Sequence, residues 1–482
     1  MLKGLEISEV ALKDVLLDNA TFRIDPEYFK KEYTHFSPCD LNVKPLSYFV
    51  ASGYRVVYGN TEVLNPKFAK PGDSPFFLQA VDIQTPFINS DNLKYVCKGD
   101  WDRYPQGRIK RGELLIEVKG QLEKVAVVPE DFPEHTLVSG TLYKMTINDK
   151  ISKYVILAYL ISKFGVSFKN RYKTNLLVSY ISKDDLYRIP VPEFSKRLQD
   201  KVDAIFCEIF ANQEAAKVAY NDAEQMLLAE LGFAGWSPTD DAVSVKSYSD
   251  FVSARRFDAE YFQPKYDELF ALLDKCKTRP LGGKDGLVNI QRSIEPGSDA
   301  YSDKGVPFVR IADFTEMGIT SPEIHISQDI CVDSPRPKKD TILLSKDGSV
   351  GIAYKVEEDL DVVTSSGILH LTVKDAAVLP NYLTLVLNSK IVRLQAERDA
   401  GGSIIQHWKQ SEIENVSIPI LPMSSQQEIS AKVRESFALR AESKRLLDLA
   451  KHAVEVAIEQ GEERAMDMIS TLLISKSNQQ SK

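Results

Sequence analysis

A phrase of seven residues occurs twice in this chain with only two substitutions. It is RIDPEYF at 23–29 and RFDAEYF at 256–262, so the copies lie 256 − 23 = 233 residues apart. Solenoid repeats have much shorter periods, of roughly 20–50 residues. The spacing therefore indicates that a whole domain was duplicated within the 482 residues of the chain.

Other landmarks repeat at nearly the same distance and in the same order. Four pairs of segments are separated by 228 to 231 residues. They are FFLQAVDI ending at Ile83 with PFVRIADF ending at Phe314, KRGELLIEVKG ending at Gly120 with KKDTILLSKDG ending at Gly348, Ile189-Pro190 with Ile418-Pro419, and Leu198, Lys201, Val202 and Phe206 with Ile429, Lys432, Val433 and Phe437. Chance does not produce such ordered agreement, so the sequence predicts two diverged copies of one fold.

Each copy contains a globular part of mixed secondary structure. In 40–192 and 275–421, short runs of β-branched and aromatic residues alternate with Gly, Pro, Asn and Asp, a pattern typical of many short strands. Helical segments such as KYVILAYLISKF and NYLTLVLNSKIV interrupt the strands. The sequence therefore predicts two α+β domains.

A long helix follows each globular part. Apolar residues recur at steps of mostly three and four within 198–231 and 429–458, and Gly232 and Gly461 are placed to end the helices. A helix of about 30–40 residues with an apolar stripe needs a partner that covers the stripe, and its own duplicate is the economical one. Because the chain must return to build the second domain, we predict two pseudo-two-fold-related globular domains separated by a pair of long antiparallel helices.

The predicted organisation has seven segments. They are an N-terminal repeat segment at 1–39, the first globular domain at 40–192, a central long helix at 193–232, a linker and repeat segment at 233–274, the second globular domain at 275–421, a C-terminal long helix at 422–475 and a disordered tail at 476–482. The repeated RxDxEYF phrase is interpreted as a structural anchor. In this interpretation Tyr and Phe dock a loop onto a helix, and Arg and Asp cap it or pair.

The chain resembles the specificity subunit of a type I restriction-modification system. The resemblance covers nearly the whole chain and rests on an Ile-Pro element joined to a Gln-bearing helix start, SIPILPMSSQQEISAKV in the second copy and RIPVPEFSKRLQDKV in the first. It is most specific where this junction follows the Gly-Gly-Ser run at 401–403. The first copy departs from the pattern, because NRYKTN replaces the glycines and Gln199 lacks the pair formed by Gln427 and Glu428.

The resemblance implies a role in DNA recognition. In that family each globular domain is a target recognition domain that reads one half of a split site in double-stranded DNA, and the helices set the gap. The implied partners are DNA, two modification (methyltransferase) subunits docked on the helices and, optionally, restriction subunits. No catalytic residue, cofactor or metal is implied in this chain, since the modification subunits would use S-adenosylmethionine.

The sequence also predicts a cytoplasmic protein with no membrane partner. The five cysteines are widely spaced and odd in number, which fits a reducing compartment. The N-terminal residues lack a signal-peptide core, and the longest apolar runs are far shorter than the ~20 residues of a membrane span.

Candidate DNA contacts are the basic and amide side chains of the globular domains, because cations neutralise phosphates and Arg, Lys and Gln bond base edges. The windows RYPQGRIKR and KFGVSFKNRYK stand out in a chain of net charge −8. The candidates are Arg103, Arg108, Lys110, Arg111, Lys163, Lys169, Arg171 and Lys173 in the first domain, and Arg292, Arg310, Arg336, Lys338, Lys339, Lys346, Arg393, Gln406, His407 and Lys409 in the second. A solvated charged face is the alternative interpretation for each.

Two other functions stay open. Glu117 and Lys119 form the Glu-x-Lys half of a metal-dependent nuclease, with Asp102 as a second carboxylate. The aligned residues Ser345 and Asp347 favour an ordinary strand edge instead. A non-catalytic adaptor would use the same helices to hold two protein-binding heads. The sequence contains no phosphate-loop, GxSxG or HExxH motif, so we expect that the chain itself is not an enzyme.

Overall fold

A computed structural model describes most of the chain in two compact units. The first comprises Met1–Ala211 with Glu442–Lys482, and the second comprises Asn212–Ala441. The described residues are 9–17, 23–30, 39, 41–56, 63–64, 68–70, 72–90, 93–174, 177–241, 243–320, 322–402 and 405–477.

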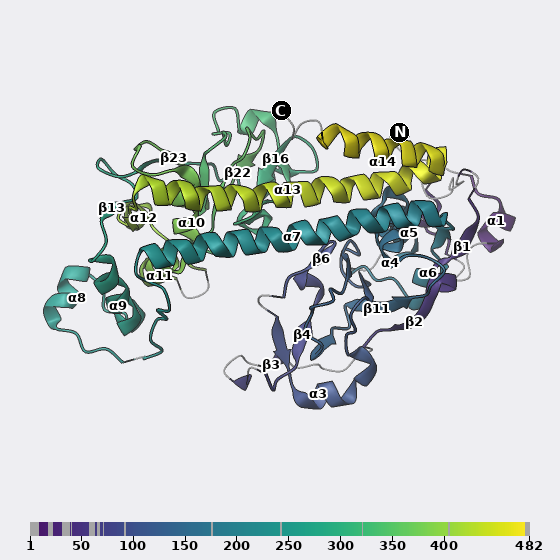
Figure 1. Ribbon diagram of the computed structural model, residues 1–482, viewed down its shortest axis with the longest axis horizontal. Coiled ribbons are helices and arrows are strands. Elements are labelled where there is room, and N and C mark those ends of the chain that lie inside the picture. The colour runs from purple at the N-terminus through teal and green to yellow at the C-terminus, as the bar shows by residue number, and fades with distance from the viewer. Residues whose placement is uncertain are drawn as a thin grey trace. The chain divides into compact units, whose positions relative to one another are not determined.

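The first unit contains two four-stranded sheets (Figure 1). The main sheet has the order β2-β11-β8-β9 with antiparallel neighbours, and the second has the order β10-β4-β7-β3, in which β10 and β4 are parallel. Two-stranded pairs β1-β12 and β5-β6 complete it. The strands are β1 Val43–Pro45, β2 Val50–Tyr54, β3 Val63–Leu64, β4 Phe76–Leu78, β5 Ile83–Gln84, β6 Phe87–Ile88, β7 Lys94–Val96, β8 Leu114–Glu117, β9 Val125–Val127, β10 Thr136–Val138, β11 Leu142–Ile147 and β12 Pro190–Pro192.

The second unit repeats this topology strand by strand. Its main sheet has the order β14-β23-β20-β21, and its second sheet has the order β22-β16-β19-β15 with β22 and β16 parallel. The pairs β13-β24 and β17-β18 take the places of β1-β12 and β5-β6. The strands are β13 Thr278–Pro280, β14 Val288–Arg292, β15 Tyr301–Ser302, β16 Val306–Val309, β17 Phe314–Thr315, β18 Gly318–Ile319, β19 His325–Ile326, β20 Ile342–Ser345, β21 Ala353–Lys355, β22 Val363–Thr364, β23 Ile368–Val373 and β24 Ser417–Pro419. The predicted duplication and the α+β class of both domains are confirmed.

A broken helix packs on the main sheet of each unit. It is α4 Lys153–Ile161 with α5 Lys163–Tyr172 in the first unit, and α10 Pro380–Asn388 with α11 Lys390–Asp399 in the second. The breaks fall at Ser162 and Ser389, whose hydroxyls donate to the carbonyls of Tyr159 and Val386 at 2.7 and 2.6 Å. Serine competes for backbone hydrogen bonds in this way, which ends one helix and caps the next.

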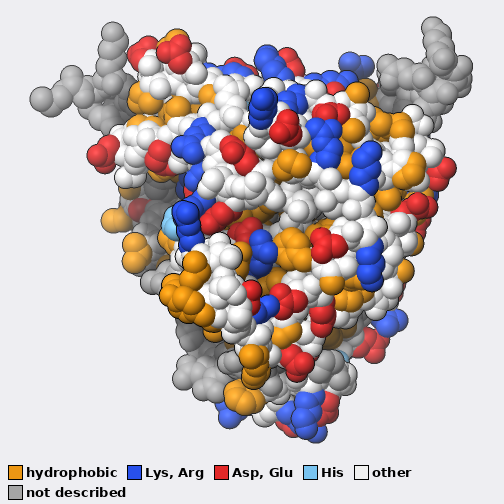
Figure 2. Space-filling model, turned by 90° about the vertical axis from the view of Figure 1, so that its left-hand side faces the viewer, with side chains coloured by type: hydrophobic (Ala, Val, Ile, Leu, Met, Phe, Trp, Pro, Cys, Tyr) orange, Lys and Arg blue, Asp and Glu red, His pale blue; other side chains and the backbone are white. Residues whose placement is uncertain are grey.

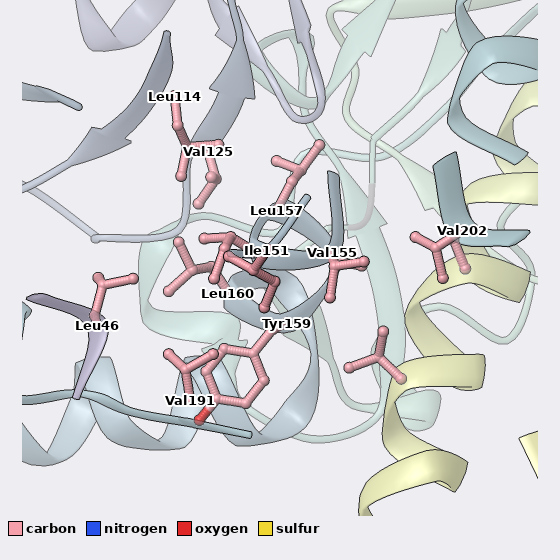
Figure 3. Close-up of a cluster of buried hydrophobic side chains, with 14 of the residues drawn as sticks. Leu46, Leu114, Val125, Ile151, Val155, Leu157, Tyr159, Leu160, Val191 and Val202 are labelled. Carbon is pink, nitrogen blue, oxygen red and sulfur yellow. The ribbon is translucent and has the colours of Figure 1, made fainter. Parts of the chain in front are cut away.

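The core of the first unit lies between α4 and the main sheet (Figure 3). Every residue of α4 from Val155 to Leu160 is buried, because the helix is apolar all round, and it packs against β9. The hydroxyl of Tyr159 donates to the carbonyl of Pro190 in β12. Tyr382 of α10 makes the same bond with Pro419 of β24 at 2.8 Å. The repeated Ile-Pro element is therefore the edge on which each buried tyrosine is anchored.

The two long helices are α7 Lys196–Glu230 and α13 Met423–Gln460. In the second unit, Ser436 Oγ donates to the Ala216 carbonyl at 2.7 Å, and Lys432 lies 3.7 Å from Asp222. Residue numbers rise along one helix as they fall along the other, so the predicted antiparallel packing is confirmed (Figure 1). The buried residues repeat every three or four positions, which is why these sequences form amphipathic helices that pair.

The predicted alignment of the two helices is wrong by one turn. In the first unit, Ser443 Oγ donates to the Ile209 carbonyl at 3.1 Å, which is a further contact of the same antiparallel pairing. The buried glutamines that make equivalent bonds at the two helix starts, Gln199 and Gln426, lie 426 − 199 = 227 residues apart, not 231. A shift of four residues is close to the 3.6-residue helical turn, so it places apolar residues on apolar residues and the sequence pattern does not detect it.

The glutamine at each helix start follows the same offset. Gln199 accepts from Ser152 N and donates to the Phe194 carbonyl, both at 2.8 Å. Gln426 accepts from Leu379 N at 3.0 Å and donates to the Leu421 carbonyl at 2.9 Å. The first copy therefore keeps the buried glutamine, and its counterpart is Gln426, which directly precedes the pair formed by Gln427 and Glu428.

The RxDxEYF phrase is a helix cap, as predicted. Arg23 pairs with Asp25 and donates to the Lys173 carbonyl at the end of α5, at 2.8 Å in both cases. Arg256 pairs with Asp258 and donates to the last carbonyl of α11 at 2.8 Å. Each arginine satisfies a backbone carbonyl that the helix leaves without an intrahelical partner.

The remaining helices are short or terminal. They are α1 Leu12–Leu17, α3 Lys98–Arg103, α6 Lys183–Arg188, α8 Tyr248–Ala254, α9 Pro264–Leu273, α12 Gln410–Glu414 and α14 Glu462–Ser477. Gly461, with φ of 91°, ends α13 as predicted, and α14 then runs into the first two residues of the predicted tail. Residues 478–482 of that tail lie outside the described residues. Among the described helices, none has the length and apolar character needed to cross a lipid bilayer.

Candidate nucleic-acid interface

A basic turn precedes β8 in the main sheet of the first unit and β20 in the main sheet of the second. In the first unit it carries Lys110 and Arg111, and in the second Lys338 and Lys339, and all four side chains are exposed. Each turn passes through a left-handed residue, Gly112 or Asp340, with φ of 75° and 65°. The duplicated backbone therefore presents two cations at the same place in both domains.

These cations have acidic neighbours. Arg111 lies 3.3 Å from Glu134, and Lys338 lies 3.1 Å from Asp359. Figure 2 shows the same intermixing on one face of the molecule, where blue and red side chains alternate. Exposed pairs of this kind contribute little to stability, about 0–1 kcal/mol, and high salt screens them. A polyanion can therefore displace the carboxylates at small cost.

The other candidate cations occupy varied positions. Arg108 stacks on Trp101 with 4.3 Å from guanidinium carbon to ring centre, and Arg310 pairs with Asp313 at 3.1 Å. Four more lie beside single acids: Arg103 by Asp100 at 3.7 Å, Arg336 by Asp361 at 3.2 Å, Arg393 by Glu316 at 2.7 Å and Lys409 by Glu412 at 3.2 Å. Lys163 pairs with Glu459 of α13, and Lys173 donates to Asn170 at 3.0 Å.

Lys169 and Arg171 do not form a DNA-facing surface, and that prediction is corrected. Both side chains are buried. Lys169 Nζ donates to the Leu122 carbonyl at 2.7 Å, and burial lowers its pKa to about 8. Arg171 donates to the Tyr28 carbonyl at 3.2 Å and lies over the Tyr28 ring. Helix α5 buries the face that carries these two cations, where they brace loops of the first domain.

In each domain, the loop that follows an inner strand of the main sheet, β8 or β20, meets a second loop. In the first domain, Gly120 N donates to the Ser179 carbonyl and Ile181 N donates to the Val118 carbonyl, both at 3.0 Å. This frame places Lys119 opposite Tyr180 in a β-bridge. The Lys119 side chain is exposed, and the guanidinium of Arg55 lies 4.8 Å from the centre of the Tyr180 ring.

The second domain builds the same frame from different residues. Gly348 N donates to the Gln406 carbonyl at 2.8 Å, and Trp408 N donates to the Lys346 carbonyl at 2.7 Å. Asp347 therefore stands opposite His407, where the first domain has Lys119 and Tyr180.

Five of the predicted candidates lie in or beside this second loop pair, together with Asp347. His407 Nδ1 lies 2.8 Å from Asp347 Oδ1, and Lys346 pairs with the other carboxylate oxygen. The His407 side chain keeps 64% of its exposure, and Gln406 is exposed beside it. Arg292 donates to Gln410 at 2.6 Å next to Lys409. The loop pair thus joins a carboxylate, an imidazole, an amide and cations at one surface.

Arg55 and Tyr180 were missed by sequence reasoning, and Lys119 and Asp347 were considered only in weighing the nuclease. Arg55 follows β2 directly, and Arg292 ends β14. The paired strands β11 and β23 place them at equivalent positions, since Tyr54 pairs with Lys144 and Gln291 pairs with His370. Their sequence offset is 292 − 55 = 237, outside the 228–233 of the other landmarks, so the repeat alone did not reveal them.

Glu117 has a structural role in the same loop. Its carboxylate is buried and accepts from Glu123 N at 3.2 Å, inside the turn that Gly120 closes. Ser345 braces the equivalent turn by donating to the Ser349 carbonyl at 2.6 Å. Within the described part of the chain, no group of three or more His, Cys, Asp or Glu side chains is placed to hold a metal ion. Nothing in this geometry favours the nuclease alternative.

Two copies of one α+β fold, each with the same loop frame and different exposed side chains, define a two-domain recognition protein. Residues 285–443 match the family described as the type I restriction modification DNA specificity domain. The specificity subunit of the Escherichia coli type I restriction enzyme EcoBI is 22% identical over 72% of this chain and 72% of that protein. The chain is thus similar to the specificity subunits of type I restriction-modification systems, with the family match confined to its second domain.

Solved structures of such subunits are also similar to this chain. The S subunit of a type I restriction-modification system from M. genitalium has 12% identity and a TM-score of 0.36, covering 89% of this chain and 96% of that one. The HsdS subunit from Thermoanaerobacter tengcongensis has 16% identity and a TM-score of 0.29, covering 87% and 97%.

Proposed function

We propose that each α+β domain of this specificity subunit reads one half of a bipartite site in double-stranded DNA. The supporting observation is the strand-by-strand repetition of the family-matched domain in the other half of the chain, each copy with a basic turn and an exposed loop pair. Because the two domains present different side chains on the same backbone frame, each would recognise a different half-site. Phosphate contacts by the basic turns would position the duplex, and base contacts would specify it.

The long helices fix the gap between the half-sites. At 1.5 Å per residue, the 35 residues of α7 rise about 52 Å and the 38 residues of α13 rise about 57 Å. One turn of B-DNA is ~34 Å, so a spacer of this length suits half-sites separated by one to two turns. The antiparallel pairing makes the spacer stiff, because each helix covers the apolar stripe of the other.

The helices also dock two modification subunits, which carry the methyl-transfer chemistry and bind S-adenosylmethionine. Exposed charged residues such as Arg434, Glu435 and Lys444 offer a polar surface for this contact. Restriction subunits join through the same complex, and the complex acts in the cytoplasm. This chain contributes no catalytic group.

Single-molecule methylation mapping of host DNA tests the function directly. We expect a split methylated motif in cells that carry the gene and its loss on deletion. Exchanging residues 40–192 for another such domain should change only one half of the motif. Inserting one turn in both helices should widen the gap and leave both halves intact. An insertion that altered bases within a half-site would contradict the spacer.

Two results would favour the alternatives. Unchanged mobility of duplex DNA in the presence of the assembled complex would support an adaptor that holds two protein-binding heads. Metal-dependent DNA cleavage by the chain alone, abolished by Glu117→Ala, would support the nuclease.

A further inference from the structure

We infer that the loop pair at the end of β8 or β20 reads the bases in each domain, through Lys119 and Tyr180 in the first and through Gln406, His407 and Asp347 in the second. This inference rests on the proposed function and assigns its specificity-determining residues. It also states which base each set prefers.

The two domains hold their loop pairs in the same backbone frame. Both loop pairs are closed by two backbone hydrogen bonds in the same arrangement and by a third behind them, Thr174 N to the Tyr180 carbonyl at 2.8 Å and Gly401 N to the His407 carbonyl at 3.1 Å. A loop held by its backbone fixes where its side chains begin. Substitutions on such a frame change the chemistry that is presented and leave its position unchanged, which is what two readers of different half-sites require.

The basic turns give the internal contrast. Lys110 and Arg111 in one domain correspond to Lys338 and Lys339 in the other, so both turns present two cations. Because they share one chemistry, they cannot distinguish one half-site from the other. The loop pairs carry a cation and a phenol in one domain and, in the other, an imidazole, an amide and a carboxylate that pairs with Lys346. Discrimination between half-sites therefore falls to the loops.

The second domain presents hydrogen-bond acceptors. Asp347 Oδ1 lies 2.8 Å from His407 Nδ1, and in the tautomer that carries its proton on Nδ1 the other ring nitrogen, Nε2, is an acceptor. In the major groove an acceptor suits the exocyclic amino group of adenine or cytosine. The amide of Gln406, exposed on the same loop, suits N6 and N7 of adenine. The combination favours adenine in the second half-site.

The first domain presents a donor. The exposed Lys119 ammonium has three donors and no acceptor, which suits O6 and N7 of guanine. Tyr180 is held beside it by Arg55, whose Nε donates to the Gly140 carbonyl at 2.7 Å. The same place in the fold therefore donates in one domain and accepts in the other. Guanine is expected in the first half-site where the second has adenine.

The test uses the full chain assembled with its modification subunits and a library of randomised duplexes, from which bound DNA is sequenced. Lys119→Met should relax one base pair of one half-site by about ten-fold or more and leave the other half unchanged. His407→Ala should do the same at the opposite half. Lys110→Gln and Lys338→Gln are the matched controls, and they should weaken binding to all sequences alike and reduce its salt dependence.

Each outcome decides the inference separately from the proposed function. A wild-type split motif that stays identical in the Lys119→Met and His407→Ala complexes overturns the inference and leaves the function standing. A wild-type complex that selects no split motif overturns the function itself. Variant complexes are first compared with wild type for thermal stability and subunit composition. Lys275→Ala, an exposed change outside the loops, should give the wild-type motif.

Discussion

The two globular domains share every strand of their topology and differ in the polar pair at the centre of the main sheet. In the first domain, Lys144 and Glu113 form a buried ion pair at 2.7 Å. At the position of Lys144 the second domain has His370, whose Nε2 lies 2.9 Å from the Thr364 hydroxyl. The fold accepts either pair, because a buried polar group costs free energy only when its partner is missing.

The loop pairs differ in the opposite way. There the backbone bonds are kept, and the residue at the bridge changes sign from the exposed Lys119 to the partly buried Asp347. A substitution at a buried polar position must keep a hydrogen-bonding partner for the new side chain. A substitution at an exposed position has no such constraint and can adapt to the ligand. The comparison thus separates positions that hold the domain together from positions that can define what it recognises.

The largest expected effect comes from breaking the buried ion pair. Glu113→Ala leaves the Lys144 ammonium buried without its carboxylate and removes the acceptor of Lys110 N. We expect the first domain to lose about 3–5 kcal/mol, measured by urea unfolding with hydrogen exchange resolved by domain. Glu113→Leu combined with Lys144→Met should recover most of the loss. A cost below about 1 kcal/mol for the single change would show that water or another group replaces the pair.

The next effect distinguishes the second domain by its pH dependence. Burial lowers the pKa of His370 from 6.5 to about 4. Between pH 6.5 and about 4, His370 is protonated in the unfolded chain and neutral in the folded domain. The free energy of unfolding is therefore highest above pH 6.5 and decreases as the pH falls towards 4. The expected loss is roughly 3 kcal/mol, at 1.36 kcal/mol per pKa unit. His370→Gln should flatten this part of the stability curve. An unchanged slope in the variant would assign the pH dependence to other groups.

A smaller effect tests what the domains share. Tyr159→Phe and Tyr382→Phe each remove a buried hydroxyl that donates to a carbonyl of the Ile-Pro element. Each should cost about 1–3 kcal/mol, and the two costs should be similar, because the bond is the same in both domains. Thermal unfolding of the two variants and of the double variant measures this. A large cost in one domain alone would mean that the anchor has diverged.

The smallest effect concerns the exposed pairs at the basic turns. Glu134→Gln and Asp359→Asn release Arg111 and Lys338 from their acidic neighbours. Stability should change by less than about 0.5 kcal/mol in either variant. If the turns contact phosphates, DNA affinity at low salt should rise in both variants and by a similar factor. Fluorescence anisotropy at two salt concentrations measures it, and a decrease in affinity would place the carboxylates in the binding surface instead.

Much of the fold could be predicted from the sequence because the duplication repeats the same sequence pattern in both halves. The repeated RxDxEYF phrase, the Ile-Pro element and the helix periodicity each identified an element that the structure contains, and Gly232 and Gly461 marked real helix ends. Lys346, Gln406 and His407 were separate candidates in the sequence, and the structure brings them together because their two loops share backbone hydrogen bonds. The repeated signals depend on residues that are close together in the sequence, so they can be recognised without the tertiary structure.

Three features could be determined only from the tertiary structure. The offset of 227 between the two helices was not visible in the sequence because a helix looks nearly the same after one turn, and the equivalent contacts of Gln199 and Gln426 fix it. The burial of Lys169 and Arg171 was invisible because a basic helix does not say which face meets the core. Arg55 joined the site through strand pairing across the sheet. Sequence determines what a chain repeats and where it turns, whereas side-chain environment depends on which distant segments pack together.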